Sequence, residues 1–199
     1  MPLGPKAPER RRRLIVDAAL DVLRERGFAG ARMADIAQRA GTSPALVAYH
    51  FGTLGAVLTE ALVIAEDSFY ADFDHLLSGK SSALDKLWTL IDLAASGGPA
   101  IGDWVLWMEV WVQALRDEQV RATREQLDRR WRRTLLRIIE QGIGEGSFAC
   151  PDTAATSFRL ASLMDGLALQ VALRDPDLPD TRMIELWRAS AVLELAIKA

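Results

Sequence analysis

The stretch AGTSPALVAYHF, residues 40–51, joins a turn signal to the start of a short apolar helix. Gly41 permits a sharp turn, Ser43 is a favourable N-cap and Pro44 suits the first helical position. A helix of about two turns is marginal on its own in water. We therefore expect one side of this helix to pack on neighbouring helices and the other side to meet a ligand.

The sequence around this stretch has a helical period, and no segment alternates as a strand would. From Glu9 to Arg26 the apolar residues recur on one face, and Gly27 stops that helix. A second short helix is expected at 33–40 and a long one at 54–77. Further helices are expected near 82–96, 101–116, 118–143, 151–174 and 180–198, with a break at Gly97-Gly98-Pro99. The predicted fold class is all-α.

The composition excludes several kinds of protein. No apolar run reaches the ~18 residues of a membrane span, and the start MPLGPKAPERRRR lacks the apolar core of a secretory signal. The single cysteine, Cys150, fits a reducing cytoplasm. One cysteine and two histidines, far apart in the sequence, do not indicate a zinc site. We expect a cytoplasmic protein with no metal, no cofactor and no membrane partner.

Charge is distributed unevenly along the chain. Residues 1–55 carry a net charge of +4 within a total of −3, so the remainder carries −7. A basic end on an acidic body indicates that this end meets a polyanion. The run Arg10-Arg11-Arg12-Arg13 contributes most to this positive charge. A solvated arm that meets no partner explains the run equally well.

Two short helices joined by a tight turn containing Gly form a helix-turn-helix, whose second helix enters the major groove of double-stranded DNA. Hydroxyls and free N–H groups at the start of that helix favour a phosphate, and small residues allow close approach to the bases. Leu46, Val47 and Phe51 are expected to hold the helix against its neighbours. The predicted DNA-contacting set is Arg10, Arg11, Arg12, Arg13, Arg32, Thr42, Ser43, Pro44, Ala45, Val47, Ala48, Tyr49 and His50. The plainer alternative is a helix cap followed by an exposed aromatic and an inert imidazole.

Over residues 10–60 the chain resembles the DNA-binding domain of the TetR family of bacterial repressors. The motifs AA..L...G, DIA..AG and the final YHF carry the resemblance. Three positions depart from the family pattern: Ala48 replaces a common aromatic, Leu54 a common Lys, and Ala31-Arg32-Met33 lacks the hydroxyl that caps the second helix. Loss of a contact with the DNA backbone weakens binding to all DNA sequences alike. Arg32 is a candidate to supply such a phosphate contact.

The resemblance implies a DNA-binding domain at 1–53 and a ligand-binding and dimerisation domain at 54–199. The stretches MEVWVQALRDE, GEGSF and LMDGLALQ are similar to the subgroup that contains the choline-responsive regulator of betaine synthesis. Gly52 and Gly55 lie where the two domains meet and are candidates for a hinge, or simply for a turn.

Tryptophans at helical spacing beyond residue 100 form either core or the wall of an effector pocket. An aromatic wall of this kind binds quaternary ammonium groups, and equally any flat apolar molecule. Predicted effector-binding residues are Trp104, Trp107, Met108, Trp111, Met164, Asp165 and Leu167, and the nearest polar candidates are Glu109, Gln113, Asp165 and Gln170.

The last two helices are too apolar for helices that bury a single side. Their small residues allow close helix approach, and both composition and resemblance favour a four-helix interface in a homodimer. Predicted interface residues are Phe158, Ala161, Ala168, Val171, Ala172, Ile184, Trp187 and Ala191.

These features together predict a ligand-responsive transcriptional repressor that binds a palindromic operator as a homodimer and is released by a small molecule. An activator or an effector-independent DNA binder is the first alternative. An all-helical enzyme or carrier is the second, but the sequence has no nucleophile–base pair, metal-ligand spacing or phosphate loop. The chain is therefore not expected to be an enzyme.

Overall fold

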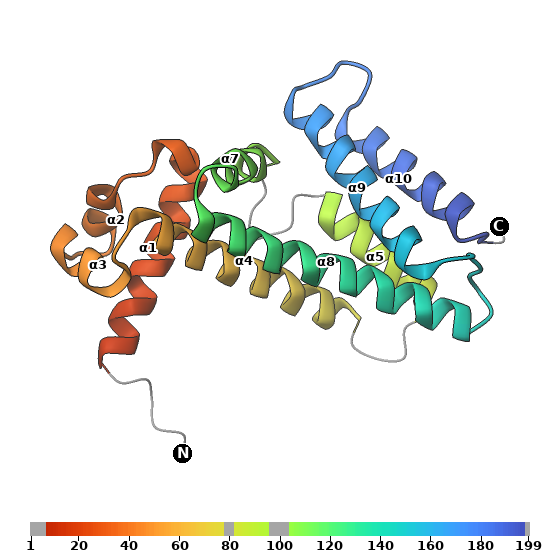
Figure 1. Ribbon diagram of the computed structural model, residues 1–199, viewed down its shortest axis with the longest axis horizontal. Coiled ribbons are helices and arrows are strands. Elements are labelled where there is room, and N and C mark those ends of the chain that lie inside the picture. The colour runs from red at the N-terminus through yellow and green to blue at the C-terminus, as the bar shows by residue number, and fades with distance from the viewer. Residues whose placement is uncertain (1–6, 78–81, 96–103, 198–199) are drawn as a thin grey trace. The chain divides into compact units, whose positions relative to one another are not determined.

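A computed structural model describes residues 7–77, 82–95 and 104–197, and every element in these ranges is a helix (Figure 1). The all-α prediction is confirmed. The helices are α1 (Ala7–Gly30), α2 (Met33–Arg39), α3 (Pro44–Phe51), α4 (Leu54–Leu76), α5 (Ala83–Ala95), α7 (Trp104–Ala114), α8 (Glu118–Gly144), α9 (Thr153–Ala172) and α10 (Asp180–Glu194).

The helix boundaries follow the local signals in the sequence. Gly27 breaks α1 with φ 69° and ψ 178°, and three residues continue the helix beyond the break. Asp152 caps the start of α9 through its side chain. The predicted break at 97–99, and residues 101–103 of the predicted helix 101–116, lie outside the described residues.

The chain divides into two compact units, each made of segments distant in sequence. The first unit holds the described residues up to Glu66 together with Val105–Arg124, and the second holds the described residues of 67–104 and of the chain from Glu125 onward. Both α4 and α8 therefore contribute residues to each unit. The predicted division into a DNA-binding domain at 1–53 and a ligand-binding and dimerisation domain at 54–199 stays a prediction.

In the first unit, the apolar face predicted for α1 is buried. Ile15, Ala19 and Leu23 are almost inaccessible, as is Ile36 of α2. Helix α2 contacts both α1 and α3. Arg39 of α2 also forms an ion pair with Glu25 of α1, with N–O distances of 2.5 and 2.6 Å. The hydrogen bond from Arg39 lowers the pKa of the Glu25 carboxyl, so this pair braces α2 on α1 at neutral pH.

The core of the second unit is built by α5, α8, α9 and α10, together with Tyr70 and Phe73 of α4. Leu87, Ile139, Leu160 and Trp187 are among its largest fully buried side chains. The indole N–H of Trp187 donates a hydrogen bond of 3.1 Å to the carbonyl of Leu160, so this tryptophan joins α10 to α9 through both its ring and its polar group.

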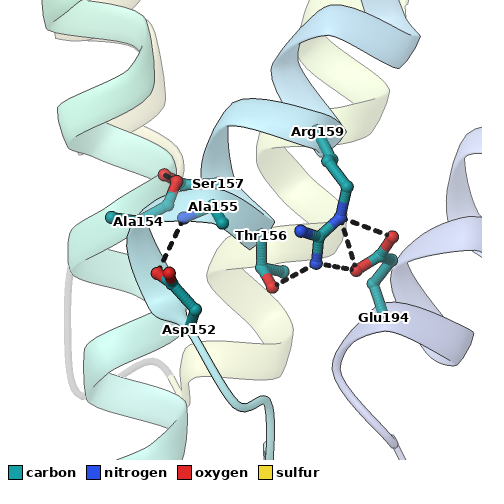
Figure 2. Close-up of polar contacts among 7 residues, drawn as sticks. All are labelled: Asp152, Ala154, Ala155, Thr156, Ser157, Arg159 and Glu194. Atoms are coloured by element: carbon teal, nitrogen blue, oxygen red, sulfur yellow. Dashed lines mark hydrogen bonds and ion pairs between the residues drawn. The ribbon is translucent and has the colours of Figure 1, made fainter.

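Polar contacts at the start of α9 fix its end and attach it to α10 (Figure 2). The Asp152 carboxylate accepts a hydrogen bond of 2.9 Å from the backbone N–H of Ala155. The Arg159 guanidinium donates to both carboxylate oxygens of Glu194 and, at 2.9 Å, to Thr156 Oγ1. The hydrogen bonds from Arg159 lower the pKa of the Glu194 carboxyl.

None of the described helices is by itself both long and apolar enough to span a membrane. Only α3 and α4 taken together reach the required length and hydrophobicity, and they are bent by 71° at their junction.

Candidate nucleic-acid interface

The turn between α2 and α3 has the geometry that its sequence predicts. Gly41 has a φ of 60°, in the left-handed region that favours glycine. The N–H of Thr42 bonds the carbonyl of Ala37 at 2.9 Å and so closes the end of α2. Ser43 Oγ accepts a hydrogen bond of 3.2 Å from the N–H of Leu46, which is the predicted N-cap. The turn therefore holds two short helices as a helix-turn-helix.

Helix α3 has one buried side and one free side. Val47 is 0% exposed, and Leu46 and Phe51 are half-buried. These three residues anchor the helix, as expected. The assignment of Val47 to the DNA-contacting set is wrong, because a side chain enclosed in the core presents no surface to a duplex.

The outer side of α3 carries most of the remaining predicted contact residues. Tyr49 is 83% exposed, and its ring meets that of His50 edge to face at 5.5 Å. The side chains at the start of the helix are small, so its backbone is accessible from this side. Ser43, Pro44, Ala45 and Ala48 are exposed, while Thr42 and His50 are half-buried.

The basic residues predicted as an arm belong to the first turns of α1. Arg10, Arg11 and Arg13 are exposed. Arg12 is different, because its guanidinium donates to the carbonyl of His50 and pairs with Glu60. Two of its donors are thus engaged within the chain, although its side chain stays 41% exposed, and its assignment as a DNA contact stays a prediction.

Arg32 keeps its place among the candidates. It precedes α2 in an extended conformation, is exposed, and makes no side-chain capping bond. Its side chain is thus not used to cap α2, and the phosphate contact expected of Arg32 stays a prediction.

Glu109 has a role that the sequence did not reveal. Its carboxylate accepts hydrogen bonds from the backbone N–H groups of Phe28 and Ala29, directly after the break at Gly27. We expected Glu109 to line an effector pocket. Instead it satisfies donors at the break in α1, and no periodicity in the sequence indicates that pairing.

The predicted effector-binding residues are divided between the two units. Trp107, Met108 and Trp111 are half-buried in the first unit. Trp104 packs against the core of the second unit, where Met164 is buried and Leu167 partly buried. Asp165 is half-buried on α9. The pocket stays a prediction.

The second unit contains an aromatic cluster that the sequence analysis did not predict. The Phe69 and Trp131 rings lie 6.3 Å apart, and Trp131 lies 6.0 Å from Trp187. Tyr70 meets Phe69 edge to face at 5.2 Å and carries the Arg130 guanidinium 4.0 Å above its ring. The adjacent aromatic residues at 69 and 70 in the long helix are the sequence feature that could have indicated this cluster. We name Phe69, Tyr70, Trp131 and Trp187 the aromatic cluster.

Half of the predicted dimer interface lies in the core of the chain itself. Ala161, Ala168, Trp187 and Ala191 are each at most 5% exposed, so their assignment to an interface between subunits is corrected. Helix α10 contacts both α9 and α5, and α9 and α10 both contribute to the core of the second unit, which accounts for the apolar residues that are buried. Phe158 is exposed, and Val171, Ala172 and Ile184 are half-buried.

A capped, outward-facing helix behind a tight glycine turn, flanked by exposed arginines, defines a helix-turn-helix DNA-binding protein. Comparison with known families agrees. Residues 15–61 match the tetR family of bacterial regulatory proteins, and residues 89–195 match the C-terminal domain of BetI-type transcriptional repressors. The chain belongs to the TetR family and carries a BetI-type C-terminal domain, as the sequence motifs predicted.

Individual proteins are similar over most of the chain. The HTH-type transcriptional regulator BetI of Escherichia coli K12 is 30% identical over 191 residues, covering 89% of this chain and 90% of its own length. BetI of Agrobacterium fabrum is 29% identical over 171 residues, covering 84% and 80%. A protein of Saccharomonospora viridis, described as a transcriptional regulator and solved in complex with choline, superposes with a TM-score of 0.83 at 26% identity, covering 96% and 100%.

These similarities decide between the classes considered above. The protein is a helix-turn-helix transcriptional regulator, and its family is one of regulators rather than enzymes. The prediction that it is not an enzyme is confirmed on that basis.

Proposed function

We propose that the protein is a repressor that binds a palindromic operator as a homodimer and leaves it when a small molecule binds. The observation that carries this proposal is the two-sided character of α3, with Val47 buried and Tyr49 exposed. A helix fixed by one side and free on the other is what insertion into the major groove requires.

The proposed DNA contacts are of two kinds. Pro44, Ala45 and Ala48 leave the α3 backbone open to base edges, while Ser43 and Tyr49 offer hydroxyls to phosphates. Exposed arginines of α1 supply charge beside them. The remaining proposed contacts are Arg10, Arg11, Arg13, Arg32, Thr42 and His50.

The test of DNA binding is a mobility shift with the DNA upstream of the protein's own gene. We expect a specific complex that Tyr49→Ala weakens and that Leu76→Ala, at an exposed site of the second unit, leaves unchanged. Wild-type protein that binds this DNA no better than random DNA contradicts the proposal.

A homodimer is proposed through the outer faces of α9 and α10. Phe158 and Leu169 on α9 and Leu173 at its C-cap recur at helical spacing, and Leu173 is 68% exposed. Leu193 on α10 is 82% exposed. Exposed apolar side chains along two neighbouring helices favour a protein partner over water. A two-fold dimer places two α3 helices on half-sites ~34 Å apart or a multiple of that.

Light scattering at micromolar concentration tests the dimer. Leu173→Asp together with Leu193→Asp is expected to yield monomers, and Leu76→Asp, an exposed leucine of α4, serves as the matched control. A monomeric wild type contradicts this part of the proposal.

A quaternary ammonium compound such as choline is the proposed effector. The aromatic cluster supports it, because each ring face attracts a desolvated cation by ~0.5–2 kcal/mol, and the Tyr70 face already accepts the Arg130 guanidinium. The buried indole N–H of Trp131 has no hydrogen-bond partner among the described residues, so it is available to a ligand oxygen. The Saccharomonospora viridis protein solved with choline supports the same class. The predicted wall at Trp104, Trp107, Met108 and Trp111 is the alternative location.

Tryptophan fluorescence during a choline titration tests this step, with ethanolamine as the control that lacks the quaternary nitrogen. We expect a saturable change with choline that Trp131→Leu abolishes. A flat trace at millimolar choline excludes this effector. Release of bound operator by choline distinguishes a repressor of this kind from an effector-independent DNA binder.

A further inference from the structure

Arg12 of α1 makes three contacts around the end of the recognition helix α3. Its Nη1 donates a hydrogen bond of 3.0 Å to the carbonyl of His50. Its Nη2 forms an ion pair with the carboxylate of Glu60 on α4. Its guanidinium carbon lies 4.2 Å from the centre of the Phe51 ring. One side chain thus joins α1, α3 and α4, all within the first unit.

The contact with His50 satisfies a group that α3 cannot satisfy itself. The last carbonyls of a helix have no donor from the following turn. At this end the Gly52 N–H bonds the Ala48 carbonyl at 2.7 Å, and the Thr53 N–H bonds that of Phe51 at 2.9 Å. The His50 carbonyl receives the Arg12 guanidinium instead. A cation there also lies at the negative end of the helix dipole.

The contact with Glu60 orients the guanidinium. A planar guanidinium presents its donors in a rigid fork, so a carboxylate on one nitrogen directs the other nitrogen toward a second acceptor. Glu60 lies on the side of the fork that faces α4, and the His50 carbonyl takes the other. The Phe51 ring covers the plane of the fork. A single side chain therefore contacts the end of α3 at two points and α4 at a third.

We propose that Arg12 is a positioning residue that holds the recognition helix at its working angle and makes no contact with DNA. This inference rests on the proposed function of α3 in the major groove. It separates Arg12 from its neighbours Arg11 and Arg13, which are exposed and offer their charge to phosphates.

Salt dependence distinguishes the two roles. Removal of one phosphate-binding charge reduces the slope of log Kobs against log salt by ~0.9. We expect Arg12→Ala to reduce operator affinity roughly tenfold with an unchanged slope, because the charge it removes is not at a phosphate. The matched control, Arg13→Gln, is expected to reduce the slope.

The conservative variant provides a second readout. Arg12→Lys keeps the charge but loses the fork, so we expect it to bind operator as weakly as Arg12→Ala. A phosphate contact would instead be rescued by lysine. In a double-mutant cycle, Arg12→Ala with Glu60→Gln is expected to bind no more weakly than Arg12→Ala alone, since both changes remove one arrangement.

The outcomes separate this inference from the function beneath it. If the wild-type protein binds no operator, both the proposed function and the role of Arg12 are contradicted. If the wild type binds operator, three results would contradict the role of Arg12 without affecting the proposed function. These are full operator affinity in Arg12→Ala, a salt slope that Arg12→Ala reduces by about one, and affinity restored by Arg12→Lys. Thermal unfolding of each variant checks folding. If Arg12→Ala does not fold, the same measurements on Arg12→Lys and Glu60→Gln decide the question.

Discussion

The carboxylate of Glu109 in α7 accepts a hydrogen bond from the backbone N–H of Phe28 in α1, although 81 residues separate the two in sequence. The same carboxylate receives the N–H of Ala29 at 3.4 Å. The break at Gly27 exposes these donors, because the helix no longer supplies their partners. One acid on a distant helix therefore completes the end of α1 and ties α7 into the first unit.

Replacement of Glu109 is expected to destabilise the first unit. Glu109→Ala leaves the Phe28 N–H partly buried without an acceptor, at a cost of about 1–3 kcal/mol. Glu109→Gln retains one acceptor oxygen and is expected to lose less. Urea unfolding of the two variants measures the difference. Equal stability of wild type and Glu109→Ala would mean that water replaces the carboxylate freely.

Substitution of Gly27 tests the same junction from the other side. Its φ of 69° with ψ of 178° is accessible almost only to glycine. An added Cβ also comes within 2.5–2.9 Å of the Glu109 carboxyl group. We expect Gly27→Ala to lose about 1–3 kcal/mol of stability.

Gly30→Ala is the matched control for that substitution. Gly30 lies in the same helix without a positive φ, and an added Cβ there meets only Arg26 Cβ at 3.4 Å. Its stability should equal or slightly exceed that of wild type. If both alanine variants unfold at the same urea concentration, the conformation at Gly27 carries no special cost.

The two sides of α3 are expected to respond differently to truncation. Val47→Ala removes buried methyl groups and should cost about 2 kcal/mol in folding stability. Tyr49→Ala, at an exposed site, should alter stability by no more than about 0.5 kcal/mol while it weakens operator binding. Chemical unfolding and mobility shifts on the same samples measure both effects. A Tyr49→Ala protein with full affinity would remove this residue from the interface.

The Arg159–Glu194 pair predicts a pH dependence of stability. The hydrogen bonds from Arg159 lower the pKa of Glu194 in the folded chain. A carboxyl with a lowered folded pKa stabilises the protein above its unfolded pKa of about 4.3 and loses that effect as pH falls through the folded value. The urea midpoint of wild type should therefore exceed that of Glu194→Gln at pH 7, and the difference should shrink as pH drops below about 4. If the difference in urea midpoint persists at low pH, the packing of the Glu194 side chain rather than its charge accounts for it.

Several parts of this protein could be predicted from the sequence because their causes are local. Gly41, Ser43 and Pro44 act within a few residues of one another, and they set the turn and the start of α3. The period of the apolar residues likewise predicted α1, α4 and the later helices. The TetR motifs lie in the same stretch, so the class of protein followed from it.

The sequence did not reveal which partner each residue has, since several partners are equally compatible with a helical period. Arg12 and Arg13 are adjacent and identical in type, yet only Arg12 reaches His50 and Glu60. Trp187 and Ala191 were equally suited to a core or to a subunit interface, and packing placed them in the core. Local sequence therefore determined the helices and the recognition turn. The tertiary fold decided which arginine is engaged, which acid caps α1 and which apolar side remains outside, because those contacts join residues that only packing brings together.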